Sequence, residues 1–170
     1  EQLINLGADV TRRDVFGETP IQVISRANNA PVFKKLLAKG APALTVGDNK
    51  GRCPIHTATV DNRLDFLRII IKNVKDINVR DSRGCTALHL ACYYGHVDCV
   101  KALVGAGADT TVVDNYKRSI LHHVCSGRSN SIELIQFVLG TNATTHVNLQ
   151  DVKGRTALYL SVVHALDATR

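Results

Sequence analysis

Histidine and cysteine are the residue types of this 170-residue chain that are best suited to catalysis or metal binding. Three histidines, His56, His89 and His122, recur at intervals of 33 residues. A residue that returns at a fixed period serves a repeating unit of structure, whereas an active site needs such a group in one place. We therefore expect a structural role for these three histidines, and we expect the neighbouring His123 to lie on the surface.

The cysteines do not form a pattern typical of disulfides or metal sites. Their number, five, is odd, and no pair has Cys-x-x-Cys spacing. Tetrahedral zinc needs clustered ligands, whereas Cys85, Cys92 and Cys99 are predicted to lie on a turn and two different helices. We expect free thiols in a reducing compartment, with no metal and no cofactor. The full set is Cys53, Cys85, Cys92, Cys99 and Cys125.

The sequence also lacks the motifs of common enzymes. It has no Gly-x-Ser-x-Gly, no His-Glu-x-x-His and no phosphate-binding loop, and its recurrent aspartates stand one per repeat instead of in catalytic pairs. No run of 18 apolar residues predicts a membrane span, and the first residues lack the features of a signal peptide. We expect a non-catalytic segment that is cytoplasmic or faces the cytosol from a membrane protein, with the nucleus as an alternative.

One stretch, from Asp81 to Asp114, organises the rest of the chain. It opens with Asp-x-x-Gly, a turn in which Gly84 can take a positive φ. Two short segments with apolar residues at helical spacing follow, and they end at Gly95 and Gly105. Helices of about ten residues do not hold alone in water, so this unit needs neighbours to cover its faces.

Copies of this unit recur along the chain. Its opening aspartates stand at positions 14, 48, 81, 114 and 151, separated by 34, 33, 33 and 37 residues. A related tetrapeptide begins each first helix: Thr19-Pro20-Ile21-Gln22, Cys53-Pro54-Ile55-His56, Thr86-Ala87-Leu88-His89, Ser119-Ile120-Leu121-His122 and Thr156-Ala157-Leu158-Tyr159. The period and the tetrapeptide resemble the ankyrin repeat, a turn-helix-helix unit of about 33 residues.

The resemblance covers essentially the whole chain and implies an all-α ankyrin-repeat solenoid. In that fold, antiparallel helix pairs stack into a curved array, and the turns project as hairpin-like fingers at one edge. The resemblance also implies that the recurrent Thr and His tie each turn to its neighbours by hydrogen bonds.

We expect one domain over residues 1–170. Its units are a partial repeat over 1–13, four repeats over 14–47, 48–80, 81–113 and 114–150, and a partial repeat over 151–170. Neither end carries the polar cap of a complete array, so we expect an excerpt of a longer one. The fourth repeat is longer by four residues, around 126–130 and 140–145, and such insertions either mark a binding face or are neutral.

The tips of the turns are strongly basic, in a chain with a formal net charge of +6. The resemblance implies partner contacts at the tips and along the first helices. We predict a protein partner with an acidic or phosphorylated surface, bound at Lys50, Arg52, Arg80, Arg83, Tyr93, Tyr94, Tyr116 and Arg118. The basic residues of the tips are Arg12, Arg13, Lys50, Arg52, Arg80, Arg83, Lys117, Arg118, Lys153 and Arg155.

Other interpretations remain open. The basic row can be a solvated edge, or it can bind a polyanion such as RNA or an anionic membrane surface, with steep salt dependence. The segment can also be a spacer within a long array. The resemblance further makes Asn78 and Asn148, which precede turns, candidates for hydroxylation by an intracellular oxygenase.

Overall fold

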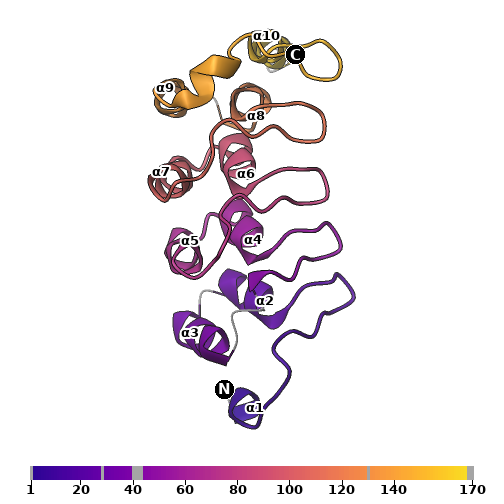
Figure 1. Cartoon of the computed structure of the whole chain (residues 1–170), viewed down its shortest axis with the longest axis vertical. Helices are drawn as coiled ribbons and strands as arrows, with labels where there is room; N and C mark the ends of the chain where they lie inside the picture. Colours follow the sequence, from indigo (N-terminus) through magenta and orange to yellow (C-terminus); the bar gives the residue numbers. More distant parts are fainter. Residues whose placement is uncertain (1, 28, 40–43, 130, 168–170) are drawn as a thin grey trace.

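The structure is a stack of short helices with loops projecting along one edge (Figure 1). It is a computed structural model that describes residues 2–27, 29–39, 44–129 and 131–167. The inner column, next to the loops, contains α2 (Pro20–Arg26), α4 (Pro54–Val60), α6 (Ala87–Tyr94), α8 (Ile120–Ser126) and α10 (Ala157–Asp167). The outer column contains α3 (Ala30–Lys39), α5 (Leu64–Ile71), α7 (Val97–Gly105) and α9 (Ile132–Leu139), followed by the 3₁₀ helix η2 (Asn142–His146). The short helix α1 (Gln2–Asn5) lies at the N-terminal end of the stack, in contact with α3.

The recurrent histidine stands in the first turn of α4, α6 and α8, and in α4 and α8 it also contacts a backbone carbonyl of the next repeat. In α6 the Nδ1 atom of His89 accepts the backbone N–H of Thr86 at 3.2 Å, which closes a capping box. In α4 the Nε2 atom of His56 lies 3.1 Å from the carbonyl oxygen of Val79 and 3.2 Å from that of Cys85, both in the following repeat. The expected structural role of this histidine is therefore confirmed.

The core runs between the two columns as one continuous apolar cluster. Phe33 of α3 meets Phe66 of α5 edge to face, with ring centroids 4.8 Å apart, and both side chains are buried. Full burial of such a side chain contributes about 1.5–3 kcal/mol. Because each helix has too few residues to hold alone, this contact between neighbouring repeats is what keeps the helices folded.

The projecting loops, called fingers 1 to 5 here, are residues 14–18, 48–52, 81–85, 114–118 and 151–155. Each finger after the first donates a backbone N–H to a carbonyl of the preceding finger; Ser82 N, for example, donates to Lys50 O at 3.0 Å. Gly51 makes this close approach possible: its φ is +71°, and a Cβ there would lie only 2.8 Å from the backbone nitrogen of Ser82. The fingers therefore form a ladder with a defined spacing, which fixes the positions of their side chains.

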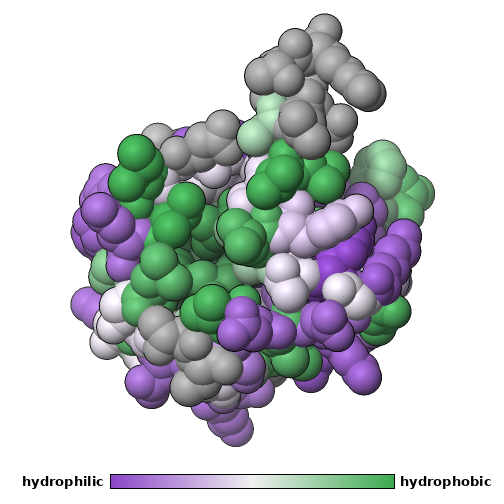
Figure 2. Space-filling view, turned by 90° about the horizontal axis from the view of Figure 1, so that it is seen from above, coloured by the Kyte–Doolittle hydropathy of each residue, from purple (hydrophilic) through white to green (hydrophobic). Residues whose placement is uncertain are grey.

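The C-terminal end of the stack exposes apolar side chains. Seen end-on from the C-terminal side, the stack shows a broad hydrophobic surface (Figure 2), and α10 carries the exposed side chains of Leu158, Tyr159 and Val162. None of the described helices has the length and apolar character needed to span a bilayer. The proposed repeat boundaries and the excerpt from a longer array remain predictions.

Candidate partner-binding surface

Every opening aspartate accepts hydrogen bonds from its own finger. In finger 2 the Oδ1 atom of Asp48 accepts the backbone N–H groups of Lys50 at 2.8 Å and Arg52 at 2.9 Å. The same pair of bonds, to the second and fourth residues after the aspartate, recurs in the other four fingers. These carboxylates therefore shape the turns, as expected from the sequence.

In three fingers the other carboxylate oxygen is bound by the arginine four residues on. Arg52 donates Nε to Asp48 Oδ2 at 2.8 Å, and its Nη2 lies 2.7 Å from the same oxygen. Arg118 pairs with Asp114, and Arg155 with Asp151, in the same way. These three arginines belong to the fold of the turn, and their charge is largely neutralised.

The aspartates of these pairs are held in the ionised form. Burial by itself raises the pKa of Asp48, but hydrogen bonds from Arg52 and from two backbone N–H groups outweigh it, so the pKa is below its ordinary value. The pKa of Asp114 is lowered strongly, because bonds from His123 and Arg118 likewise exceed the effect of burial. Each pair thus stays charged and paired at neutral pH.

Arg80 has a different structural task, since it links finger 3 to the backbone just before finger 4. Its Nε donates to the carbonyl of Gly84 at 3.1 Å, and its Nη2 donates to that of Val113 at 2.7 Å. Arg13 occupies the equivalent place before finger 1, where it donates to the carbonyl of Gly17 at 2.9 Å. Both guanidinium groups are exposed, but they are already engaged in hydrogen bonds within the fold.

Lys50 and Arg83 are the cations of fingers 2 and 3 that lack a close ionic partner among the described residues. Lys50 is exposed, and no ion pair within that part of the chain involves its side chain. The Nε atom of Arg83 lies 3.8 Å from Asp81 Oδ2, and 61% of the Arg83 side chain is exposed. Both can turn toward a bound group at little cost.

These two cations border a hollow of about 470 Å³ between fingers 2 and 3 and the inner helices. Arg52 and Asp81 also line it, and Val60, Leu90 and Tyr94 supply apolar surface from α4 and α6. Of the eight residues predicted for partner binding, Lys50, Arg52, Arg83 and Tyr94 therefore share one concave surface.

The comparison with known proteins agrees with this architecture. A family model described as ankyrin repeats in three copies matches residues 1–81, 28–114, 68–151 and 88–169, so the matches together reach across nearly the whole chain. The chain belongs to the ankyrin-repeat family. A segment of 64 residues, 37% of the chain, is 38% identical to the tyrosine-protein kinase HTK16 of Hydra vulgaris, and the match spans 8% of that kinase.

Other predicted contact residues of this ankyrin array lie outside the hollow. Tyr116 is 49% exposed, with the guanidinium of Arg118 5.1 Å from its ring centroid, and both line a separate hollow of about 210 Å³ toward finger 5. Tyr93 packs edge to face against Tyr94 at 5.2 Å and lies 6.3 Å from the ring of His123 in the next repeat. Tyr93 therefore also serves packing between repeats.

Tyr94 itself is held on two sides. Its ring stacks on His96 with centroids 5.8 Å apart and an interplanar angle of 12°, and the guanidinium of Arg128 lies 5.1 Å from its centroid. Arg128 lies in the segment, around 126–130, that is predicted to be the first insertion of repeat 4. The backbone of Arg128 also donates to the carbonyl of Tyr93 at 2.8 Å. Sequence reasoning missed this residue, since nothing in its spacing links it to α6.

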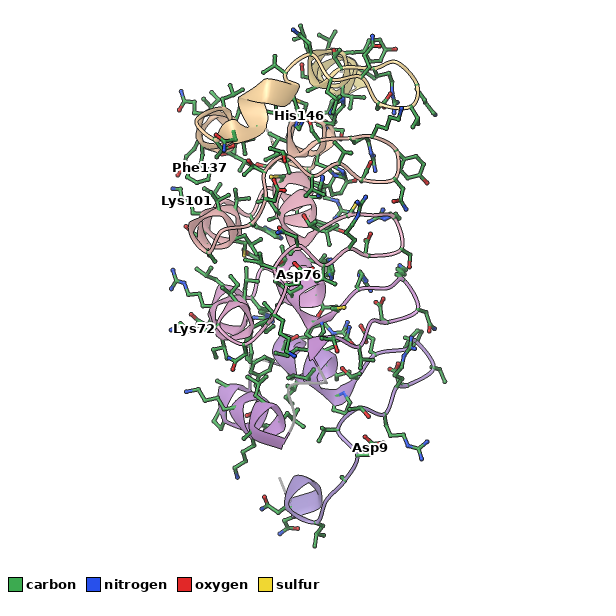
Figure 3. All side chains as sticks on the ribbon, viewed as in Figure 1. Asp9, Lys72, Asp76, Lys101, Phe137 and His146 are labelled. Carbon is green, nitrogen blue, oxygen red and sulfur yellow. The ribbon has the colours of Figure 1, made fainter. Side chains whose placement is uncertain are left out.

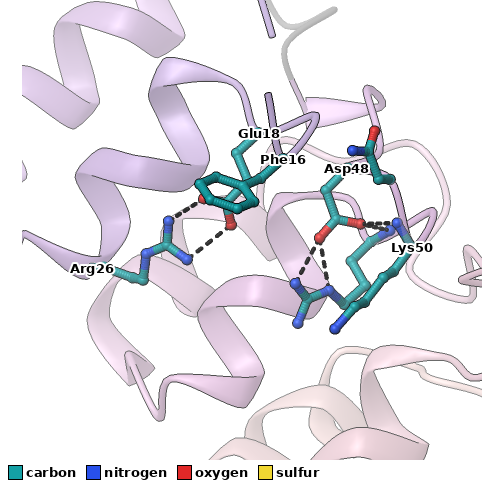
Figure 4. A pocket seen from close by; sticks show the side chains of 7 residues that line it. Phe16, Glu18, Arg26, Asp48 and Lys50 are labelled. Carbon is teal, nitrogen blue, oxygen red and sulfur yellow. Dashed lines mark hydrogen bonds and ion pairs between the residues drawn. The ribbon is translucent and has the colours of Figure 1, made fainter. Parts of the chain in front are cut away.

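A neighbouring hollow, of about 410 Å³, contains the acidic residue Glu18, which is an exception among the basic tips (Figure 4). Glu18 stands at the finger position that holds Arg52 in the next repeat, and it is paired with both terminal nitrogens of Arg26. Phe16, 69% exposed, also lines this hollow.

The expected surface position of His123 is wrong. Its side chain is 4% exposed, and its Nε2 atom lies 3.1 Å from Asp114 Oδ2. Burial lowers the pKa of His123, although the bond to Asp114 opposes this, so the neutral ring donates Nε2–H to the carboxylate. Of the equivalent residues, Thr57, Leu90 and Leu160 are also buried, whereas Val23 is 44% exposed. The register of most repeats therefore indicates an inward position.

The two candidate hydroxylation sites differ in their surroundings. The Oδ1 atom of Asn78 accepts the backbone N–H of Asp109 at 2.9 Å, which ties two repeats together. Asn148 is exposed. Hydroxylation of either residue remains a prediction.

Proposed function

We propose that this ankyrin array is a non-catalytic protein-binding module that holds an acidic segment of a partner protein in the hollow between fingers 2 and 3. The observation that carries the proposal is the pair of loosely bound cations, Lys50 and Arg83, in a hollow that the partly exposed Val60 and Tyr94 also line. Ankyrin repeats generally mediate contacts between proteins.

Some basic residues of the fingers are bound within the turns and others are not, and this difference reduces the set of residues that we propose for contact with the partner. Arg52, Arg80 and Arg118 are engaged in the turns, so changes to them would act on the fold as well as on a partner. Lys50 and Arg83 can instead meet carboxylates, or phosphates if the partner segment is phosphorylated. The adjoining Tyr94 offers an aromatic anchor of the kind that dominates many interfaces.

Pairing within the fingers also makes a polyanion a weaker fit than a protein. Of the ten basic tip residues, Arg52, Arg118 and Arg155 each lie within 2.7 Å of an aspartate oxygen. The positive charge left for a phosphate backbone is therefore smaller than the sequence count suggests, and it is local to particular fingers.

The similarity to a tyrosine-protein kinase concerns 64 residues and 8% of that protein. It supports a role in which such repeats accompany a catalytic domain, and it does not transfer kinase activity to this segment. The five free cysteines suit a reducing compartment, so we place the module in the cytosol or the nucleus.

Affinity capture from cytosolic extract tests the proposal. The wild-type chain is compared with the double variant Lys50→Glu, Arg83→Glu at low and moderate salt. The control is Lys72→Glu, Lys75→Glu, which makes the same change of charge at exposed residues, with Lys72 on the side away from the fingers (Figure 3).

A defined protein should be retained by the wild type and the control at both salt concentrations and lost by the finger variant. Its association rate with the finger variant should fall by about tenfold or more, because reversed charges oppose steering. Capture of RNA or lipid alone, lost with rising salt, would favour the polyanion. If all three chains retain the same proteins, the fingers are a solvated edge or a spacer and the proposal fails.

A further inference from the structure

Finger 3 departs from the pattern of its neighbours at one position. The fourth residue after the aspartate is an arginine in fingers 2, 4 and 5, where it pairs with that aspartate. In finger 3 it is Cys85, which is fully buried although it stands on a turn. Its thiol points toward the next repeat, with Sγ 3.9 Å from Asp114 Oδ2.

The next repeat departs from its pattern as well. His123 occupies a position on α8 that is filled by residues without an ionisable side chain elsewhere in the array, namely Val23, Thr57, Leu90 and Leu160. Its ring is buried and turns its Nε2 atom toward finger 4. Two exceptions to the repeat, from different units, thus face the same carboxylate.

The result is a compact set of sulfur, nitrogen and oxygen atoms. Cys85 Sγ, Asp114 Oδ2 and His123 Nε2 all lie within 4.8 Å of one another, and the three residues are buried. They come from finger 3, finger 4 and α8, so the inter-repeat ladder and the core hold them in place. Analysis of cysteine spacing alone could not find this set, because only one of its members is a cysteine.

We propose that Cys85, Asp114 and His123 form a binding site for a divalent transition metal of the Zn²⁺ type. Bond lengths of about 2.3 Å to sulfur and about 2.0–2.2 Å to nitrogen and oxygen imply separations of roughly 3.3–3.6 Å between tetrahedral ligands. The observed separations are 3.1 Å between nitrogen and oxygen, 3.9 Å between sulfur and oxygen and no more than 4.8 Å between sulfur and nitrogen. Side-chain shifts of at most about 1.2 Å bring all three pairs into the tetrahedral range.

The donor set also selects among metals. A thiolate and an imidazole suit Zn²⁺ and related ions, whereas Mg²⁺ and Ca²⁺ prefer oxygen ligands throughout. Three protein ligands leave a fourth position for water, as in zinc sites that are not closed by protein.

Binding requires three defined changes at the site. The Cys85 thiol releases its proton to solvent, and the His123 proton moves from Nε2 to Nδ1, a buried atom that has no hydrogen-bond partner in the described part of the chain. The ion pair between Arg118 and Asp114 Oδ2 breaks, and the Arg118 side chain turns toward solvent. This movement is possible because the side chain is already 23% exposed. The thiolate and the carboxylate then balance the two positive charges of the metal, so no net charge is buried.

Titration of the metal-free chain with Co²⁺ tests this site, since a thiolate bound to Co²⁺ gives a charge-transfer absorption band in addition to the visible bands of a tetrahedral ion. One Co²⁺ per chain with that band is expected, and Zn²⁺ should displace it. Cys85→Ser and His123→Leu should each weaken binding by more than about 100-fold, while the matched control Cys125→Ser should bind as the wild type does.

A gain of affinity separates loss of the site from loss of the fold. Arg118→Gln removes the group that competes for Asp114 Oδ2 and should tighten Co²⁺ binding by about tenfold, which a destabilised chain would not do. Circular dichroism confirms that each variant is folded. Absence of the charge-transfer band in the wild type, its persistence in Cys85→Ser, or its loss in Cys125→Ser would overturn the proposal.

Discussion

Lys50 and Arg52 stand two residues apart in finger 2 and carry the same charge, yet the structure gives them opposite roles. Arg52 makes two short contacts with Asp48 Oδ2, at 2.8 and 2.7 Å, whereas Lys50 is exposed. We therefore predict that Arg52→Gln destabilises the array and that Lys50→Gln leaves its stability unchanged, although both remove one positive charge.

The expected loss of stability follows from the state of Asp48 after Arg52 is replaced. The Asp48 side chain is 2% exposed, so its Oδ2 atom would lose its cation while Oδ1 kept two backbone N–H groups. Breaking a fully buried ion pair costs about 3–5 kcal/mol. Because the Arg52 side chain is 23% exposed, water can replace part of its contact, and we expect a loss of about 2 kcal/mol. Lys50→Gln should stay within about 0.5 kcal/mol.

Urea unfolding followed by circular dichroism measures both free energies of unfolding. A loss of about 2 kcal/mol should also lower the melting temperature by roughly 4–8 °C in a chain of this size. Adding Asp48→Asn to Arg52→Gln should cost less than the sum of the single changes, since no charge is then left unpaired. Equal midpoints for Arg52→Gln and Lys50→Gln would refute the division of the basic row into structural and free residues.

Three further predictions concern the fingers, and all can be read from urea unfolding midpoints. Lys117 has a φ of +59° where the other fingers have glycine. Lys117→Gly should therefore stabilise the chain by about 0.5–1 kcal/mol, because the backbone strain that it relieves exceeds the conformational entropy that glycine adds to the unfolded chain. A loss of stability would contradict this prediction. Gly51 and Gly154 both have a φ of +71°, but only a Cβ at Gly51 meets the next finger, so Gly51→Ala should cost about 1–3 kcal/mol more than Gly154→Ala, and equal costs would contradict the close approach. For Asp48 and Asp151, burial raises the pKa but hydrogen bonds lower it further, so the pKa is depressed on folding. Their stabilisation should be complete above about pH 4, the unfolded value, and be lost as the pH falls through the folded values; an unfolding midpoint that does not fall below pH 4 would count against these pairs.

Much of the framework could be predicted from the sequence because a repeat states its local rules several times. Asp-x-x-Gly marks four of the five turns, and the residue three places after each helix cap is a histidine in three of the repeats. These features act over a few residues, through turn geometry and capping, so the chain alone reveals them. The period then implies that the units stack, since none is long enough to fold by itself.

The sequence also led to a predicted partner-binding surface, but it did not show which charges are available there. Arg52 and Lys50 look alike in a count of basic tips. The tertiary structure separates them, because the path of the finger directs one side chain back to Asp48 and the other to solvent. Arg80 likewise becomes a bridge only when the segment before finger 4 is in place to offer the carbonyl of Val113.

Contacts that depend on departures from the repeat were the hardest to foresee. Cys85 and Asp114 are 29 residues apart in sequence, and His123 follows Asp114 by nine. Each of the two off-pattern residues has an ordinary explanation when taken alone. Their meeting depends on the spacing between consecutive fingers and the rotation of α8, which are set by packing between whole repeats. The sequence by itself thus determined the repeating framework, whereas the stacking of the repeats decided which side chains of different repeats meet.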